Sequence, residues 1–166
     1  MVYLCCIVQV SCRSRNFVSA RQPIPFNASV ASVGHEDVDS GSYDWDGRSR
    51  GSVQMSLFQY TLSGQGLLLR DGKEVSVESG QALLLNVPGD HRYCLPPTSE
   101  RWEFLYVCLV GAEIWRIWEL MENKCHGVVT LPPAQTCIAT LREMTDLTTV
   151  PHDPTPFALS SIAYRL

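Results

Sequence analysis

The stretch that decides the fold runs from Gly64 to Tyr106 and begins G-Q-G-L-L-L-R-D-G-K-E-V-S-V-E-S-G-Q-A-L-L-L-N-V-P-G-D-H-R-Y. Short apolar runs alternate in it with turn residues. Asp71-Gly72 lies between two such runs, and Asp-Gly in that position predicts a hairpin because a type I′ turn needs positive φ. Turn residues return at 78–80 and 88–90. Turns at intervals of about eight to ten residues are typical of a small β-sandwich or barrel.

The order and spacing of these motifs resemble the cupin-type sensor domain of AraC-family transcription regulators. The resemblance covers roughly Ser32 to Leu166 and rests on G-Q-G at 64–66, D-G-K-E-V-x-V at 71–77, P-G-D-H-x-Y at 88–93, W-E-F-x-Y-V at 102–107 and Y-D-W-D-G-R-S-R-G at 43–51. It implies a mainly β fold, in which a cupin-type double-stranded β-helix, or jelly-roll barrel, is followed by two or three C-terminal α-helices.

Length and composition are those of an ordinary globular domain. The chain has 166 residues, of which 45% are hydrophobic and 18% charged, so it is long enough for one sizeable core. Its net charge of −4 and scattered basic residues argue against a nucleic-acid-binding face. An odd number of cysteines without zinc-type spacing indicates a reducing compartment, and we expect a cytoplasmic protein. The seven are Cys5, Cys6, Cys12, Cys94, Cys108, Cys125 and Cys137.

Residues 1–25 are predicted to be an N-terminal arm or extension outside the core. Val2–Val10 is apolar, but it is too short to cross a bilayer and has no basic residue ahead of it, so no membrane contact is expected. Two prolines make Arg21–Pro25 a linker. The barrel is predicted over residues 26–111, with a first strand at Phe26–Val33 and a surface loop at Gly34–Gly47.

Alternation identifies the remaining strands. Gln54–Leu62 is predicted as a strand leading into a turn at Gly64–Gly66, and further strands are predicted at Gln81–Val87 and His91–Leu95. In Arg101–Val110, Trp102, Phe104, Tyr106 and Cys108 share one face. From alternation alone, this aromatic face is either barrel core or a platform for a ligand.

A helical period begins at Ala112, and residues 112–166 are predicted as C-terminal helices. The first ends before Gly127, the second follows Pro132-Pro133, and the third starts with Thr155 as N-cap. The apolar pattern of the third helix still runs at Leu166, as expected if a further domain follows. Family members pair through such helices, and the residues predicted for a homodimer interface are Trp115, Trp118, Ile162 and Leu166.

A metal-dependent cupin enzyme is the first alternative. The metal-binding cupin motif would need histidines within Arg50–Val53 and a glutamate at Leu57, so only His91 falls at a ligand position. One imidazole does not hold a catalytic metal, which needs about three protein ligands. G-x-S-x-G and a phosphate-binding glycine loop are also absent from the sequence. We therefore predict no metal, no cofactor and no enzymatic activity.

The resemblance implies a ligand inside the barrel. In the arabinose-binding members of the family, the positions of Tyr93, Phe104 and Tyr106 face the sugar, and an arginine matching the Arg48–Arg50 segment hydrogen-bonds it. Phe104 and Tyr106 replace the histidine and tryptophan of those members, so arabinose itself is not expected. Such a pocket would suit a sugar or similar polyol. The predicted ligand-binding residues are Arg48, Arg50, His91, Tyr93, Trp102, Phe104 and Tyr106.

The chain is therefore predicted to be the ligand-sensing and dimerisation domain of an AraC-family transcription regulator. DNA would be bound only through a C-terminal domain beyond this chain. Besides the metal-dependent cupin enzyme, an isomerase or dioxygenase, a standalone sugar-binding module remains as an alternative.

Overall fold

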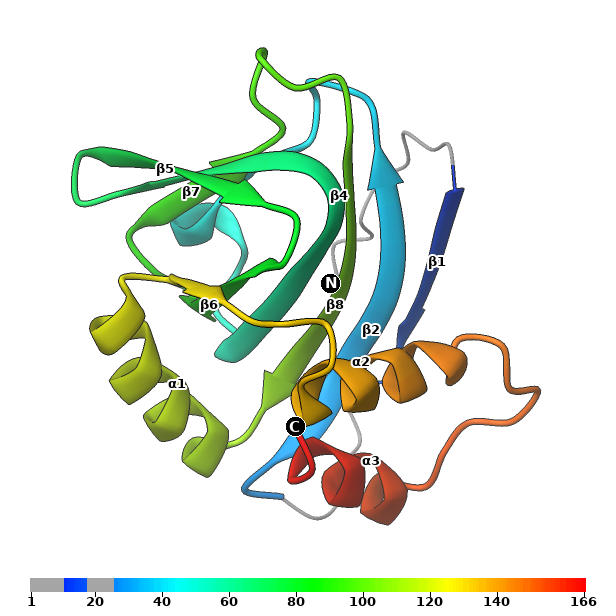
Figure 1. Cartoon of the computed structure of the whole chain (residues 1–166). Coiled ribbons are helices and arrows are strands. Elements are labelled where there is room, and N and C mark those ends of the chain that lie inside the picture. Colours follow the sequence, from blue (N-terminus) through cyan, green and yellow to red (C-terminus); the bar gives the residue numbers. More distant parts are fainter. Residues whose placement is uncertain (1–10, 18–25) are drawn as a thin grey trace.

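The computed structural model describes residues 11–17 and 26–166 (Figure 1). Its nine strands form two antiparallel sheets that are joined by one long strand, β4 (Met55–Arg70). The larger sheet has the order β1 (Ser11–Asn16), β2 (Ser29–Val38), β8 (Trp102–Val110), β4, β6 (Gln81–Val87), β9 (Val128–Thr130). The smaller sheet contains β3 (Asp44–Asp46), β7 (His91–Cys94), the second half of β4 and β5 (Lys73–Glu78). This confirms the predicted mainly β jelly-roll fold with C-terminal helices.

Strand β4 bends through G-Q-G instead of ending there, so the predicted turn at Gly64–Gly66 is wrong. Gly64 has φ +72°, and a Cβ there would lie 2.0 Å from the Arg101 carbonyl oxygen. Gly66 lies against the indole of Trp102, where a Cβ would come within 2.3 Å of the ring. The two glycines therefore let β4 pass from one sheet to the other close to β8, which is why they resemble turn residues in the sequence.

The Asp71-Gly72 hairpin is confirmed, because both residues have positive φ and β4 pairs directly with β5. The predicted strand Gln81–Val87 is β6, with the same bounds. The predicted loop Gly34–Gly47 is wrong at both ends. Strand β2 continues to Val38, and β3 forms from residues 44–46, so the connection between them is short.

Part of the predicted arm belongs to the larger sheet. Ser11–Asn16 forms β1, which pairs antiparallel with β2. Arg15 fixes this strand against the far end of the chain, donating to the carbonyl of Leu147 at 2.9 Å and to the carboxylate of Asp153 at 2.7 Å. The predicted apolar segment Val2–Val10 and linker Arg21–Pro25 lie outside the described residues.

Two hydrophobic cores stabilise the domain. One lies between the sheets, with inward-facing residues such as Leu57, Leu85 and Phe104. The other lies between the larger sheet and the three helices, and it contains Phe58 and Val107. The helices are α1 (Ala112–Cys125), α2 (Thr136–Asp146) and α3 (Pro156–Ala163), and Figure 1 shows them gathered at one end of the sheets. Among the described residues, no helix is long and apolar enough to cross a bilayer.

Most of the residues predicted for a dimer interface pack inside their own chain. Trp118 is buried, and its indole N–H donates to the Leu57 carbonyl at 2.9 Å. Ile162 and Leu166 are partly buried against the same helix-side core. Three of the four side chains thus contact this core, while Trp115 is half-buried and is not part of it. The homodimer itself stays a prediction.

A partly buried ion pair joins α1 to both sheets. Glu122 accepts a hydrogen bond from the Arg70 guanidinium at 2.6 Å and one from the Asn86 backbone N–H at 3.1 Å. Burial raises the pKa of Glu122, and the Arg70 charge opposes that shift. Arg70 is also the backbone register partner of His91, where β4 pairs with β7. Helix α1 is therefore connected, through Arg70, to the strand that carries Tyr93.

Candidate functional site

Arg50 follows the short 3₁₀ turn η1 (Gly47–Ser49) and reaches toward the inter-sheet space. Its guanidinium carbon lies 4.6 Å from the centroid of the Trp45 ring, and the group donates to the Tyr93 hydroxyl. Arg48 points away, is exposed and pairs with Asp90 at 2.5 Å. Of the two arginines predicted from the sequence, the structure therefore brings only Arg50 to the other candidate residues.

Tyr106 and Glu36 form the second polar element of the site. Tyr106 lies opposite Gly34 on β2, where a Cβ would come within 2.6 Å of the phenol ring. The ring can thus lie across β2, where the hydroxyl donates to the Glu36 carboxylate. Burial raises the pKa of Glu36, and the nearby charge of Arg50 lowers it in part. Sequence analysis missed Glu36, because the segment that contains it was predicted as a loop.

Trp102 and Phe104 form the packed floor beneath these polar groups. Both side chains are fully buried, and the Trp102 indole N–H donates to the Thr61 hydroxyl at 3.1 Å. Their ring centroids are 5.1 Å apart, and Tyr43 closes on both from β3's side at 5.8 Å and 5.6 Å. From the alternation in the sequence, this aromatic face could be either barrel core or a platform for a ligand. Trp102 and Phe104 have the burial of core residues, whereas Tyr106 keeps a partly accessible ring.

His91 supports the arginine-bearing turn from below. It is buried, and a Cβ on Gly47 would lie 2.5 Å from its Nε2 atom, so η1 rests directly on the imidazole. Burial and the charges of Arg70 and Arg50 lower the pKa of His91 to about 4, which keeps it neutral near neutral pH. The ring stacks on Tyr93 with centroids 6.2 Å apart. His91 is thus placed to position the segment that holds Arg50.

Gln59 of β4 completes the polar lining and was also missed. Its side chain points between the sheets, is 1% exposed, and accepts a long hydrogen bond of 3.4 Å from the Tyr43 hydroxyl. Alternation groups Gln59 with Met55, Leu57 and Thr61 on one face of its strand, but that pattern does not show which face points between the sheets or whether the glutamine binds a ligand. Together, Arg50, Gln59, Glu36 and the phenols offer both donors and acceptors beside aromatic rings, an arrangement that suits a small hydroxylated ligand.

Residues 33–166, most of the chain and all of the groups above, match the family described as the AraC-like ligand binding domain. The chain belongs to this family. A search of curated proteins finds no match.

Several solved structures are similar over part of this AraC-like domain. YhaK from Escherichia coli is 19% identical with a TM-score of 0.46, and the match covers 61% of this chain and 45% of YhaK. A Cupin 2 conserved barrel domain protein from Salinispora arenicola is 14% identical with a TM-score of 0.41, covering 66% and 84%. The pirin YhhW from Escherichia coli, solved in complex with nickel(II), is 15% identical with a TM-score of 0.39, covering 61% and 46%.

The described part of the AraC-like domain contains no cluster of side chains that could bind a metal ion. No three His, Cys, Asp or Glu side chains there lie close enough together to hold a metal ion. His35, for example, is hydrogen-bonded to Glu103 at 3.0 Å.

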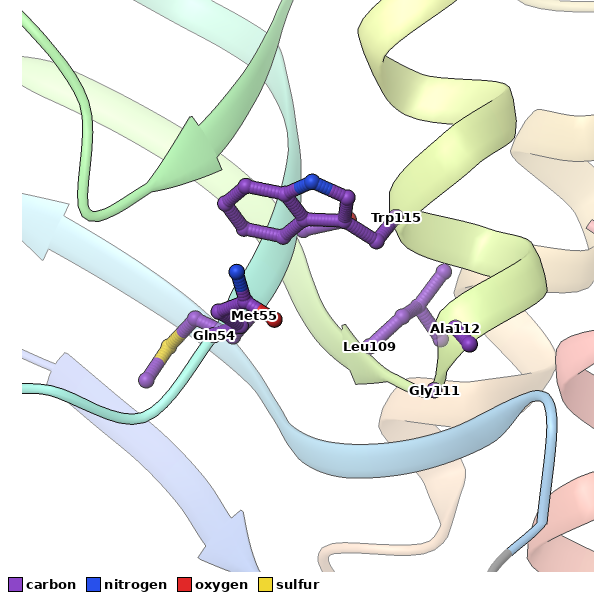
Figure 2. A pocket seen from close by; sticks show the side chains of 7 residues that line it. Gln54, Met55, Leu109, Gly111, Ala112 and Trp115 are labelled. Carbon is purple, nitrogen blue, oxygen red and sulfur yellow. The ribbon is translucent and has the colours of Figure 1, made fainter.

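A separate hollow of about 160 Å³ lies where α1 begins, next to the start of β4 and the end of β8 (Figure 2). Trp115 lies over one side of it, and Gln54 and Met55 lie on the other. Its lining includes none of the residues predicted to bind the ligand.

Proposed function

We propose that this AraC-like domain is the ligand-sensing and dimerisation part of an AraC-family transcription regulator, and that it binds a small sugar or polyol between its sheets. The observation that carries the proposal is the convergence of Arg50, Tyr93, Tyr106 and Glu36 in one place, in a chain of this family. Arg50 supplies a charged donor, Glu36 a charged acceptor, and Tyr106 a ring face.

A polyol suits this set better than a flat apolar ligand. Hydroxyl groups need oriented donors and acceptors, while the C–H faces of a sugar ring stack on an aromatic ring. Tyr106 is half-buried, and its hydroxyl is hydrogen-bonded to Glu36, whose carboxylate also lies near the charge of Arg50. A charge-assisted hydrogen bond contributes about 1.5 to 3 kcal/mol, more than an aromatic contact at about 0.5 to 1.5 kcal/mol. Arg50 should therefore dominate affinity.

The contacts of the site also offer a route to the helices. Strand β2 carries Glu36 on its inner face and packs against α2 and α3 on the other. Strand β7 carries Tyr93 and reaches α1 through the Arg70–Glu122 ion pair. A ligand that favours one arrangement of these helices would shift the population of dimer states, and so the spacing of DNA-binding domains outside this chain.

The proposal assigns no catalytic role and no cofactor to the domain. It assigns DNA binding to a domain outside this chain, since this chain has a net charge of −4. It also assigns the protein to the cytoplasm, where a regulator meets DNA and cysteines stay reduced. A metal-dependent enzyme or a standalone sugar-binding module would instead act without a DNA-binding partner domain.

A thermal-shift screen of monosaccharides and polyols tests the proposal. The unmodified domain should be stabilised by at least one member, and isothermal titration should give one site per chain. Arg50→Ala should abolish the shift, whereas Arg48→Ala, which removes an exposed arginine two residues away, should keep it. A screen without any shift, or equal loss in both variants, would refute a sugar site at Arg50.

A further inference from the structure

One buried donor between the sheets has no partner. The side-chain amide nitrogen of Gln59 makes no hydrogen bond to any described residue, although the side chain is 1% exposed. Thr61, two residues further along the same strand, is satisfied by the Trp102 indole, whereas the buried Nε2 of His91 and Oγ of Ser29 also have no partner among the described residues. Buried polar groups are hydrogen-bonded in the great majority of cases, so an orphaned amide needs an explanation.

The position of Gln59 relative to Tyr106 gives that explanation. On the larger sheet, β8 lies between β2 and β4, and Gln59 is the direct register partner of Tyr106. Glu36 reaches Tyr106 from the opposite side, on β2. Strands two apart are separated by roughly 10 Å, and the Gln and Glu side chains shorten that gap to the scale of a small ring. The amide and the carboxylate therefore flank the accessible phenol.

We propose that Gln59 is a specificity-determining residue, whose amide donates to one hydroxyl of a monosaccharide or cyclitol lying over Tyr106. A hydroxyl on the opposite edge of the same ring donates to Glu36. The inference rests on the proposed function and narrows it from polyols in general to cyclic ones with hydroxyls at both edges. A site built to hydrogen-bond a hydroxyl rejects the analogue that lacks it, because the buried partner is then left unpaired.

The rival explanation is that Gln59 only holds Tyr43 in place, through the 3.4 Å hydrogen bond from the phenol. The two explanations differ in the ligand-free protein. If the amide serves a ligand, exchanging it for an apolar side chain of similar shape removes an unpaired buried donor, and the melting temperature should stay the same or rise. If the amide is a structural contact, the melting temperature should fall.

The experiment compares Gln59→Met with Gln65→Met. Gln65 lies on the same strand but donates to the Ser76 hydroxyl at 2.6 Å, so it is a glutamine with a protein partner. The probes are D-glucose, D-galactose, L-arabinose, D-xylose, myo-inositol and D-mannitol, followed by the monodeoxy derivatives of the tightest binder, all measured by isothermal titration. One derivative should bind the unmodified domain about tenfold more weakly than its parent, and should bind Gln59→Met as well as the parent does.

Each result supports or overturns the inference. Support requires that Gln59→Met weaken the parent sugar about tenfold without lowering the ligand-free melting temperature, while Gln65→Met leaves affinity unchanged. Equal weakening of every derivative, or a clear loss of melting temperature in Gln59→Met, overturns the role of Gln59 and leaves the proposed function standing. Binding of the linear D-mannitol as tightly as any ring overturns the cyclic ligand. If no probe binds the unmodified domain, both proposals fall.

Discussion

The guanidinium of Arg50 lies over the indole of Trp45, with its carbon 4.6 Å from the ring centroid. Trp45 is itself fixed by the register of β3 with β7, where it is the partner of Tyr93. The arginine is thus held from two sides, by a ring face and by the Tyr93 hydroxyl. This contact decides which arginine of the segment faces the site.

The stacking predicts an energetic coupling between Arg50 and Trp45. Cation–π contacts contribute about 0.5 to 1 kcal/mol at exposed sites, and more when desolvated. In a double-mutant cycle with Trp45→Leu and Arg50→Ala, we expect a coupling of about 0.5 to 1 kcal/mol in the free energy of unfolding, measured in urea. The same cycle with Arg48→Ala should give none. Additive effects in the Arg50 cycle would contradict the contact.

A second prediction concerns acid stability. The pKa of His91 falls from 6.5 to about 4 on folding, so the unfolded chain takes up the proton first on acidification. The contribution of His91 to the free energy of unfolding is fully present above pH 6.5 and decreases between pH 6.5 and 4. Below pH 4 it levels off, after a total loss of roughly 3 kcal/mol. His91→Asn should therefore lose less stability than the parent across that window. Parallel urea-denaturation profiles of the two proteins would show that His91 is not the group responsible.

A third prediction concerns the ion pair under α1. Glu122→Leu removes the partner of the partly buried Arg70 guanidinium and of the Asn86 N–H, and should cost roughly 2 to 4 kcal/mol, somewhat less than for a fully buried pair. Combining it with Arg70→Met should recover a large part of that loss, because no buried charge then remains. Chemical denaturation of the single and the double variant measures the two free energies of unfolding. The control is Glu119→Gln, on the exposed face of α1. A double variant less stable than Glu122→Leu would rule out the explanation by an unpaired charge.

The bend of β4 gives a fourth prediction. Gly64 combines φ +72° with a Cβ position 2.0 Å from the Arg101 carbonyl oxygen, so Gly64→Ala strains the backbone and forces β8 to move. We expect a loss of roughly 2 to 4 kcal/mol, seen as a lower melting temperature. Gly41→Ala is the matched control, since a Cβ there meets nothing within 4 Å, and it should stay within about 0.5 kcal/mol. Equal melting of the two variants would contradict a close approach at Gly64.

Local signals were sufficient for most of the strands and for the helices, but not for β1, β3, the bend of β4 or the site. The Asp71-Gly72 turn, the alternation of β8 and the Thr155 cap act within a few residues, and the structure has all three. Glu36 was missed because its neighbours are polar too. His35 and Asp37 point outward and pair with Glu103 and Arg101 of the adjacent strands and loop, so the segment shows no apolar alternation in the sequence. Only strand pairing shows that Glu36 alone turns inward.

The arginines and the indoles show the same limit. Arg48 and Arg50 are two residues apart, and the 3₁₀ turn between them sends one to Asp90 and the other to Trp45. Trp115 and Trp118 both lie in one helix, and the sequence does not show how much of that helix the barrel covers. The structure buries Trp118 and leaves Trp115 half-exposed. Contacts between distant segments decide both outcomes.

That difference gives the last prediction, on the homodimer. Trp118 packs in the helix-side core and donates to Leu57, so Trp118→Ala should cost roughly 3 to 5 kcal/mol of folding stability whether or not the domain dimerises. Trp115 is half-buried in the first half of α1, and the same helix exposes Leu120 at 57% and Met121 at 41% further along. If this surface pairs two copies, Trp115→Glu should weaken the dimer by at least tenfold with little change in monomer stability, because a charge would be buried unpaired in the interface. Light scattering from low to high micromolar concentration measures both proteins. A strictly monomeric parent would contradict the homodimer, and a dimer unaffected by Trp115→Glu would place the interface away from α1, on α3, where Phe157 and Tyr164 are the exposed aromatic residues.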